Sequence, residues 1–216
     1  MTQIIRVNHK RFTLRQLEPA VEVLLGGGVV GAATESFYSL MVLADRSQAL
    51  ERLKSLKGDR DEDQAFLLLV DSRQRVMAYA QELPIEAELL MDKFWPGLLT
   101  ILLKAQSGLH PLILGSNKST VGLRLDRFPL TGALVRMADR AVTGTSANPH
   151  GKEPPKDAQG LLDYYTDLVD LVVDSGPAKG KKPSTVIDIS KVPFSILREG
   201  AVSTKEVLKV LPNFPQ

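Results

Sequence analysis

The 216-residue sequence has no cysteine, little net charge and no long apolar run. The lack of cysteine excludes disulfides, iron–sulfur clusters, thiolate zinc sites and a cysteine nucleophile, and it suits a reducing compartment. A formal net charge of +2 is too small to indicate nucleic-acid binding from bulk charge. The apolar stretches fall short of the roughly 20 residues that a membrane span requires, and the N-terminus lacks a signal-peptide core. We therefore expect a cytoplasmic protein without a membrane segment.

Helical and strand-like patterns alternate along the chain. Helices are predicted over residues 13–25, 45–56, 84–94, 131–137, 157–165 and 203–211. Strands are predicted over residues 29–33, 65–70, 98–105, 120–125, 141–147, 168–174, 184–189 and 195–199. Because the strand spacing is uneven and some pairs are joined by short loops, a mixed sheet is favoured over a doubly wound parallel one. We predict a single α/β domain over residues 1–216, with helices flanking the sheet and a frayed tail at 212–216.

Three local patterns add detail to this prediction. Asp45 and Gln48 are spaced as a capping box for the second helix, and the last helix has a similar box. Residues 120–125 alternate apolar and polar side chains, which is typical of a half-exposed strand. The segment 176–183 is rich in glycine, lysine and proline, and it is the one linker-like region.

Polar side chains gather at the ends of several predicted elements, with almost no candidate general base among them. They include Thr34, Glu35, Tyr38, Lys57, Arg60, Ser119, Thr120, Arg124, Thr145, Ser146, Asn148, Ser184, Thr185 and Arg198. Ligands of α/β sheets tend to bind at strand ends, and basic side chains with hydroxyl and amide partners suit a polyanion such as a triphosphate. Such a site works by positioning and charge neutralisation, as phosphoryl and nucleotidyl transfer allow.

Each of these residues also has a purely structural interpretation. Arg124 on an alternating strand is, taken alone, more often a solvated sheet residue. The "TSAN" segment is equally consistent with a turn whose side chains cap backbone amides. Lys57 is suitably placed as a favourable cation at a helix C-terminus. The acidic residues around 59–63 have no metal-ligand spacing, so the metal ligands are unknown at this stage.

Taken in order, six segments resemble the YrdC family, also called threonylcarbamoyl-AMP synthases, over about residues 17–202. These segments are "GGGVVGAATESFYSLMV", "KFWPGLLTILL", "STVGLRL", "GTSANPHG", "PSTVID" and "ILREG". The resemblance implies a twisted, open α/β sheet with a large concave basic cleft. It also implies that L-threonine, bicarbonate and ATP, with Mg²⁺, give threonylcarbamoyl-AMP and pyrophosphate. Partner proteins would then transfer the threonylcarbamoyl group to adenosine in tRNA.

The resemblance also assigns roles to individual residues. It implies catalytic roles for Lys57, Arg60 and Arg124, and nucleotide binding by Lys57, Arg60, Ser146, Asn148 and Arg198. It implies that threonine and bicarbonate are bound by Thr34, Tyr38, Thr120 and Ser184.

Several positions depart from the family pattern. Ala33, Ser39 and Met41 stand where the family has proline and glycines, and Asp126 stands where proline is usual. Asp59 occupies the place of the arginine in a Lys-x-Arg motif, and Arg60 follows one position later. These departures favour one alternative, a paralogue of the same fold that binds nucleotide or RNA with little or no synthase activity. A binder of double-stranded RNA or tRNA is a further alternative, against which the near-neutral charge counts.

Overall fold

The computed structural model describes residues 1–58, 65–115 and 118–211. Its strands are β1 (Gln3–Arg6), β2 (Val30–Ala33), β3 (Tyr38–Met41), β4 (Leu68–Val70), β5 (Leu99–Lys104), β6 (Thr120–Leu125), β7 (Val142–Thr143), β8 (Thr145–Ser146), β9 (Leu171–Asp174), β10 (Thr185–Asp188) and β11 (Ser195–Arg198). Its helices are α1 (Glu18–Leu25), α2 (Ser47–Lys57), α3 (Ile85–Phe94), α4 (Pro129–Ala138), α5 (Ala158–Tyr165) and α6 (Thr204–Val210). Short 3-10 helices are η1 (Leu14–Leu17), η2 (Gln74–Ala78) and η3 (Pro111–Ile113).

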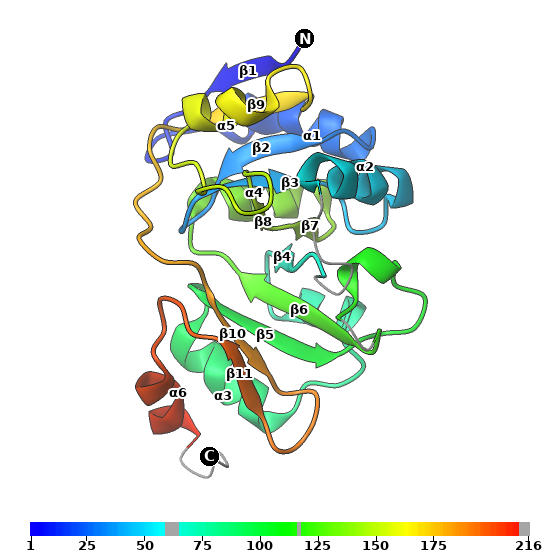
Figure 1. Ribbon diagram of the computed structural model, residues 1–216, viewed down its shortest axis with the longest axis vertical. Coiled ribbons are helices and arrows are strands. Elements are labelled where there is room, and N and C mark those ends of the chain that lie inside the picture. Colours follow the sequence, from blue (N-terminus) through cyan, green and yellow to red (C-terminus); the bar gives the residue numbers. More distant parts are fainter. Residues whose placement is uncertain (59–64, 116–117, 212–216) are drawn as a thin grey trace.

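The strands form two mixed sheets, one above the other in Figure 1. The 5-stranded sheet has the order β1-β9-β2-β3-β8, and the 6-stranded sheet has the order β11-β10-β5-β6-β4-β7. Each contains both pairings: β2 is parallel to β9 and antiparallel to β3, while β10 is parallel to β5 and antiparallel to β11. The predicted mixed α/β class is confirmed, but the single predicted sheet is divided in two.

The division occurs where the chain crosses from β7 to β8 at Gly144. The crossing segment is hydrogen-bonded to both sides, because Thr143 N donates to Val42 O at 2.9 Å and Gly144 N donates to Leu67 O at 2.9 Å. A Cβ atom added to Gly144 would lie 2.8 Å from Leu69 Cγ, which is closer than real Cβ contacts. Glycine is therefore needed here for close packing, and the apolar pattern of residues 141–147 cannot distinguish one strand from two short ones.

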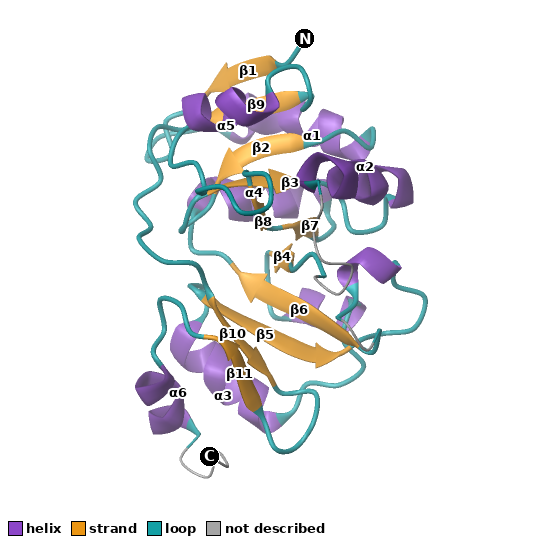
Figure 2. Cartoon of the chain, viewed as in Figure 1, coloured by secondary structure: helices purple, strands orange, loops and turns teal. Residues whose placement is uncertain are grey.

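Helices cover the outer faces of both sheets (Figure 2). Helices α1 and α4 pack on each other, and their side chains form one apolar cluster with those of β2 and β9, including Leu24, Leu134 and Val173. A larger apolar cluster fills the rest of the core and includes Leu40, Leu90 and Ile101. Helices α3 and α6 pack together beside the second sheet. The larger cluster contains residues of both sheets, and the polar residues gather in a separate cleft that both sheets line.

Most predicted helices and strands are confirmed to within a few residues, with two corrections. The capping box at Asp45 is wrong: α2 begins at Ser47 without a side-chain cap, and Asp45 instead pairs with Arg140 at 2.8 Å. The prediction that 120–125 is half-exposed is also wrong, because Thr120 to Arg124 are all buried. Strand β6 lies between β5 and β4, so its apolar side chains enter the core and its polar ones enter a deep cleft.

Two strands, β1 and β3, were not predicted. β1 is a short edge strand that pairs in parallel with β9, and most of its residues are exposed. β3 begins inside a polar segment whose composition predicts a turn. No helix in the described ranges is long and apolar enough to cross a membrane. The predicted frayed tail at 212–216 lies outside the described residues.

Candidate functional site

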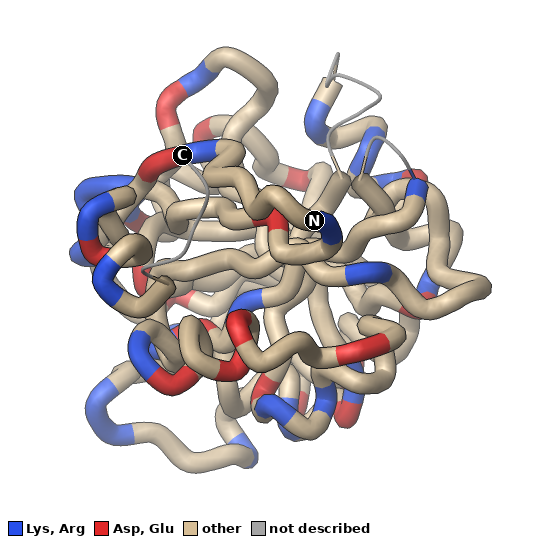
Figure 3. The backbone as a smooth tube through the Cα atoms, turned by 90° about the horizontal axis from the view of Figure 1, so that it is seen from below, with Lys and Arg blue, Asp and Glu red and all other residues tan. Residues whose placement is uncertain are grey.

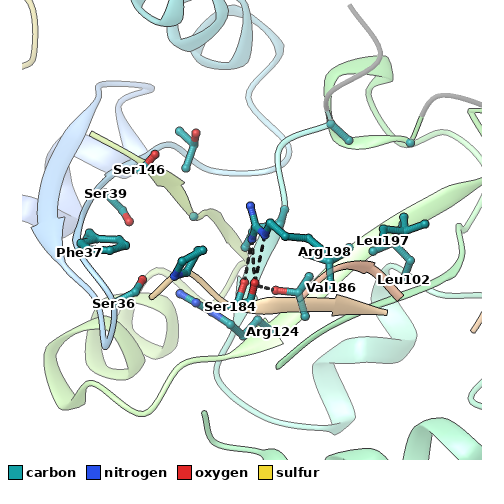
Figure 4. Close-up of a pocket in the computed structure, with 18 of the residues that line it drawn as sticks. Ser36, Phe37, Ser39, Leu102, Arg124, Ser146, Ser184, Val186, Leu197 and Arg198 are labelled. Carbon is teal, nitrogen blue, oxygen red and sulfur yellow. Dashed lines mark hydrogen bonds between the residues drawn. The ribbon is translucent and has the colours of Figure 1, made fainter. Parts of the chain in front are cut away.

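A cleft of about 660 Å³ is lined by residues of both sheets. The first sheet and its loops contribute Ser36, Phe37, Ser39, Ser146 and Asn148, and the second sheet contributes Thr100, Leu102, Thr120, Arg124, Ser184, Val186, Leu197 and Arg198. Figure 4 shows Ser36, Phe37, Ser39 and Ser146 on one side of this space and Arg124, Ser184 and Arg198 on the other. The cleft thus has a wall of hydroxyl groups opposite a wall that carries guanidinium groups.

Arg198 is held against the start of β10 by Ser184. Its Nε and Nη2 atoms donate to Ser184 O at 3.1 and 3.0 Å, and Nη2 also lies 3.2 Å from Ser184 Oγ (Figure 4). Ser184 Oγ is in turn hydrogen-bonded to Thr100 Oγ1 at 2.9 Å. This series of hydrogen bonds fixes the guanidinium of Arg198 within the cleft, and it connects β11, the start of β10 and β5.

Arg124 lies on β6 and forms a buried ion pair with Asp126. Arg124 Nη2 is 2.7 Å from Asp126 Oδ2, and the two side chains are 3% and 1% exposed. The pair lacks hydrogen-bond geometry, because Asp126 Oδ2 and Arg124 Nε are both without a hydrogen-bond partner in the described structure. Asp126 Oδ1 accepts from Glu35 N at 3.0 Å and from Phe128 N at 2.9 Å. Asp126 therefore connects Arg124 to the turn that follows β2.

Lys57 ends α2 and fastens the loop after β8. Its Nζ donates to Ser146 O at 2.7 Å and also to Asn148 O. Asn148 Nδ2 donates to Lys152 O at 2.6 Å, which closes the turn, whereas Asn148 Oδ1 is buried and lacks a partner among the described groups. The Lys57 ammonium thus binds two main-chain oxygens and positions the loop that lines the cleft.

Thr34 and Tyr38 lie behind the wall of the cleft. Thr34 Oγ1 donates to Phe37 O at 2.8 Å and shapes the turn whose residues Ser36 and Phe37 face the cleft. Tyr38 OH donates to Gly176 O at 2.9 Å and accepts from Ser175 N at 3.2 Å. Burial raises the pKa of the Tyr38 phenol, so the group stays neutral at ordinary pH.

The linker-like segment 176–183 passes over the same turn. A Cβ atom added to Gly180 would lie 2.1 Å from Ser36 O, so only glycine allows this approach. Ala178 N donates to Lys156 O at 2.6 Å, which attaches the segment to the rest of the protein at a second position. The segment is thus packed onto the first sheet before the chain enters β10 at the other wall.

The departures at Ser39 and Met41 do not strain the backbone. Both residues lie in the extended strand β3, whereas the non-glycine residues with positive φ in the described chain are Lys118, Asp139 and Asp167. Ser39 pairs with Ser146 across β3 and β8, and both side chains line the cleft. A serine in place of glycine therefore changes the space and polarity of the cleft, and it leaves the fold intact.

Basic side chains line both walls of the cleft. Lys57, Arg124, Lys191 and Arg198 line the cleft together with one carboxylate among the described residues, Asp188. Burial, and after it the charge of Arg124, lowers the pKa of Arg198. An anion between these two guanidinium groups would relieve both effects. Figure 3 shows that basic and acidic residues are interleaved elsewhere along the chain.

The structure brings together most of the predicted site residues. Those that line the cleft are Lys57, Thr120, Arg124, Ser146, Asn148, Ser184 and Arg198. Thr34 and Tyr38 are adjacent to the lining without belonging to it, and Arg60 and Asp59 lie outside the described residues. Thr100 and Asp126 were not singled out as site residues, although a threonine inside the apolar run "LLTILL" is a detectable signal. No group of three His, Cys, Asp or Glu side chains suited to a metal occurs in the described ranges.

Comparisons with known proteins find relatives over most of the chain. The family model Sua5_yciO_yrdC, described as "Telomere recombination", matches residues 22–200. A threonylcarbamoyl-AMP synthase of Pyrococcus abyssi is 30% identical over 98% of this chain, which spans 61% of that protein. A putative threonylcarbamoyl-AMP synthase of Mycobacterium tuberculosis is 32% identical, over 91% of this chain and 89% of that protein.

Solved structures give the same result. P. abyssi Sua5 complexed with L-threonine superposes with a TM-score of 0.91 at 28% identity, over 99% of this chain and 62% of that chain. E. coli YciO superposes with a TM-score of 0.87 at 27% identity, over 96% of this chain and 100% of that one.

Proposed function

The chain belongs to the Sua5/YciO/YrdC family, and from this premise we propose that it is an ATP-dependent threonylcarbamoyl-AMP synthase. The observation that supports the proposal most is the convergence of the motif residues Arg124, Ser146, Asn148, Ser184 and Arg198 on one cleft, although they come from distant parts of the chain. Relatives that bear this name are 30% and 32% identical to the chain. The P. abyssi relative has been solved with L-threonine bound.

The proposed reaction joins L-threonine, bicarbonate and ATP. The threonine nitrogen bonds to the carbon of bicarbonate with loss of water, and a carbamate oxygen then attacks the α-phosphorus of ATP while pyrophosphate leaves. Charge builds up on the phosphate oxygens, so a site that neutralises and orients them is sufficient for catalysis. The cleft supplies cations and hydroxyl groups for this purpose, and its described lining offers no obvious covalent nucleophile activated by a base.

We assign the polyphosphate to the second wall. Arg198 presents a planar guanidinium that matches phosphate oxygens, and Arg124 lies beside it with an unpartnered Nε. Ser184 holds Arg198 in place and offers its hydroxyl to the substrate. Arg60, which the resemblance also assigns to this role, belongs to the proposal on sequence grounds alone.

We assign the nucleotide and the amino acid to the opposite side. Asn148 Oδ1 is a buried acceptor without a described partner, which suits a donor group of a ligand. Lys57 holds the main chain of Ser146 and Asn148 in place for this contact. Thr120 adds a hydroxyl group from the second wall. Thr34 would act through the turn 34–37, and Tyr38 through residues 175 and 176, to which its hydroxyl is bonded.

The donor set fits a magnesium ion that arrives with the triphosphate. Magnesium sites in nucleotide enzymes combine one or two carboxylates with substrate phosphates. Asp188 is the carboxylate among the described lining residues, and it is the side chain that would meet such an ion. The metal would supply charge neutralisation at the phosphates, beside that of Arg124 and Arg198.

The proposal extends to the setting of the reaction. A cytoplasmic protein whose product passes to tRNA-modification partner proteins is consistent with the family. This chain spans 61% of the length of the P. abyssi relative.

Two observations favour a second candidate, a nucleotide-binding paralogue with little synthase activity. Ser39 narrows the cleft where the family has glycine, and Asp126 neutralises Arg124 from within. Both changes affect the reacting centre and leave the fold intact. Binding of double-stranded RNA or tRNA would be a variant of this second candidate.

The proposal is tested by measuring pyrophosphate release in assays from which each substrate is omitted in turn. Release that requires ATP, bicarbonate and L-threonine together is expected. If ATP raises the melting temperature but no combination releases pyrophosphate, the second candidate replaces the synthase. If neither occurs and RNA binds with a steep salt dependence, the cleft serves RNA.

A further inference from the structure

We propose that Asp126 is a specificity-determining residue of the cleft, whose carboxylate attenuates the charge of Arg124 toward an anionic ligand. The inference rests on the proposed function, because it assumes that the cleft receives a polyphosphate. Asp126 is one of the positions at which the sequence departs from the family pattern that it resembles.

The first support is the burial of the pair. The two side chains are 3% and 1% exposed, so water screens their interaction far less than it screens a surface pair. Arg124 Nη2 and Asp126 Oδ2 approach to 2.7 Å. A phosphate that reaches Arg124 therefore meets an almost neutral pair in place of a full positive charge.

The second support is that the pair is not saturated. Arg124 Nε and Asp126 Oδ2 both lack a hydrogen-bond partner among the described atoms. Arg124 Nε is thus a buried, unpartnered donor, although the charge of the side chain is balanced. The charge of Arg124 also acts on Arg198. Burial is the larger cause that lowers the pKa of Arg198, and the charge of Arg124 lowers it further. Removing the Asp126 charge would strengthen the field of both guanidinium groups in the cleft.

Asp126 also has a positioning role that must be separated from its charge. Its Oδ1 accepts from the amides of Glu35 and Phe128 at 3.0 and 2.9 Å, and so ties the turn of the first wall to the end of β6 in the second wall. Asparagine keeps an oxygen in this place and removes the charge. Alanine removes both.

The other charged groups near Asp126 are few. Glu35 and Arg127 face the pair: Arg127 Nε lies 3.8 Å from Glu35 Oε1, and burial raises the pKa of Glu35. These two side chains form an opposite-charge pair, so they leave the balance between Arg124 and Asp126 largely unchanged.

The test compares ATP, tripolyphosphate and adenosine as calorimetric ligands of the wild type, Asp126→Asn and Asp126→Ala. Asp126→Asn is expected to bind ATP and tripolyphosphate about tenfold more tightly at low salt and adenosine with unchanged affinity. Because a purely structural change would affect adenosine as well, the ratio of ATP to adenosine affinity reports the charge. Asp126→Ala is expected to lose part of the gain, since the turn 34–37 is released.

Asp71→Asn is the matched control. Asp71 is also a mostly buried carboxylate paired with an arginine, Arg75, but neither residue lines the cleft. This variant is expected to lose stability while its affinity for ATP does not change. Both Asp→Asn variants are compared by thermal melting, and ATP is expected to stabilise Asp126→Asn by a larger shift than the wild type.

Three outcomes are informative. If the wild type binds ATP and Asp126→Asn binds it equally or more weakly, with adenosine unaffected, the inference is overturned and the proposed function stands. If Asp126→Asn does not fold unless polyphosphate is present, the inference is supported, because the ligand has replaced Asp126 as the partner of Arg124. If the wild type binds neither ATP nor tripolyphosphate and the variant does not gain binding, both proposals are overturned.

Discussion

Replacing Arg198 by alanine gives the most direct view of the cleft, because binding and stability should respond differently. In the wild type the guanidinium donates to Ser184 O and contacts Ser184 Oγ, which are neutral groups. Burial, and after it the charge of Arg124, lowers the pKa of Arg198, so the free protein stabilises the charged guanidinium less than water does. Removing it takes away these hydrogen bonds and also relieves the repulsion from Arg124. We therefore expect the free energy of unfolding to change by less than about 1 kcal/mol.

Binding of ATP should change much more. A charge-assisted hydrogen bond contributes about 1.5–3 kcal/mol, so Arg198→Ala should raise the dissociation constant about tenfold to 150-fold. The assay is isothermal calorimetry with ATP, and urea unfolding of the free protein provides the stability. Arg198→Lys is the control: it keeps the charge but loses the planar fork, and its affinity should fall between the two.

Two results would refute this reasoning. An ATP affinity within twofold of the wild type would remove Arg198 from the site. A loss of several kcal/mol in unfolding free energy, with weaker binding that merely follows it, would show that Arg198 serves the fold through Ser184.

Two further predictions concern residues at the cleft, and a third concerns an ion pair of the fold. Tyr38→Phe should lower the free energy of unfolding by about 1–3 kcal/mol, because Ser175 N and Gly176 O lose their partner; unchanged urea unfolding, with weaker threonine binding, would instead favour a direct ligand contact. Asn148→Ala should weaken ATP binding several-fold in calorimetry, because the donor to Lys152 O and the free acceptor are both removed; equal affinity would contradict this. Burial opposes the ionised form of Asp170, but hydrogen bonds from Arg52 and Val29 N outweigh it and lower the pKa of Asp170. Its contribution to stability is therefore complete above the ordinary pKa of 3.8 and is lost as the pH falls through the lower folded value. Asp170→Asn should flatten the fall in urea stability between about pH 5 and pH 2, and an unaltered pH profile would exclude this role.

Much of the fold was predictable because helix and strand patterns are local. The ends of α3 and the bounds of β6 follow from apolar spacing and flanking prolines and glycines, which act within a few residues. The division into two sheets was not predictable, since it depends on the packing of Leu67 and Leu69 against Gly144. Such contacts join segments about 75 residues apart, and no periodicity reports them.

The site was predictable in composition but not in geometry. The motif order placed Arg124, Ser184 and Arg198 in one site, and the structure brings them to one wall. The strand pattern alone would have left Arg124 in solvent, because alternation gives the side of a strand and not what covers that side. The pairing of Arg124 with Asp126 also escaped notice, since two charges at i and i+2 at the end of a strand usually remain solvated.

The crossing at Gly144 has a consequence for the mechanics of the molecule. The main-chain amides of Thr143 and Gly144 donate hydrogen bonds to Val42 and Leu67. The residues at which the two sheets separate therefore also hold the sheets together. Spreading the walls would break these bonds and expose buried leucines, which makes the junction stiff. We expect the amide hydrogens of Thr143 and Gly144 to exchange with solvent as slowly as those of the central strands. The distance between the two sheets would then stay the same when a ligand binds, and only the loops at the edge of the cleft would adjust to it.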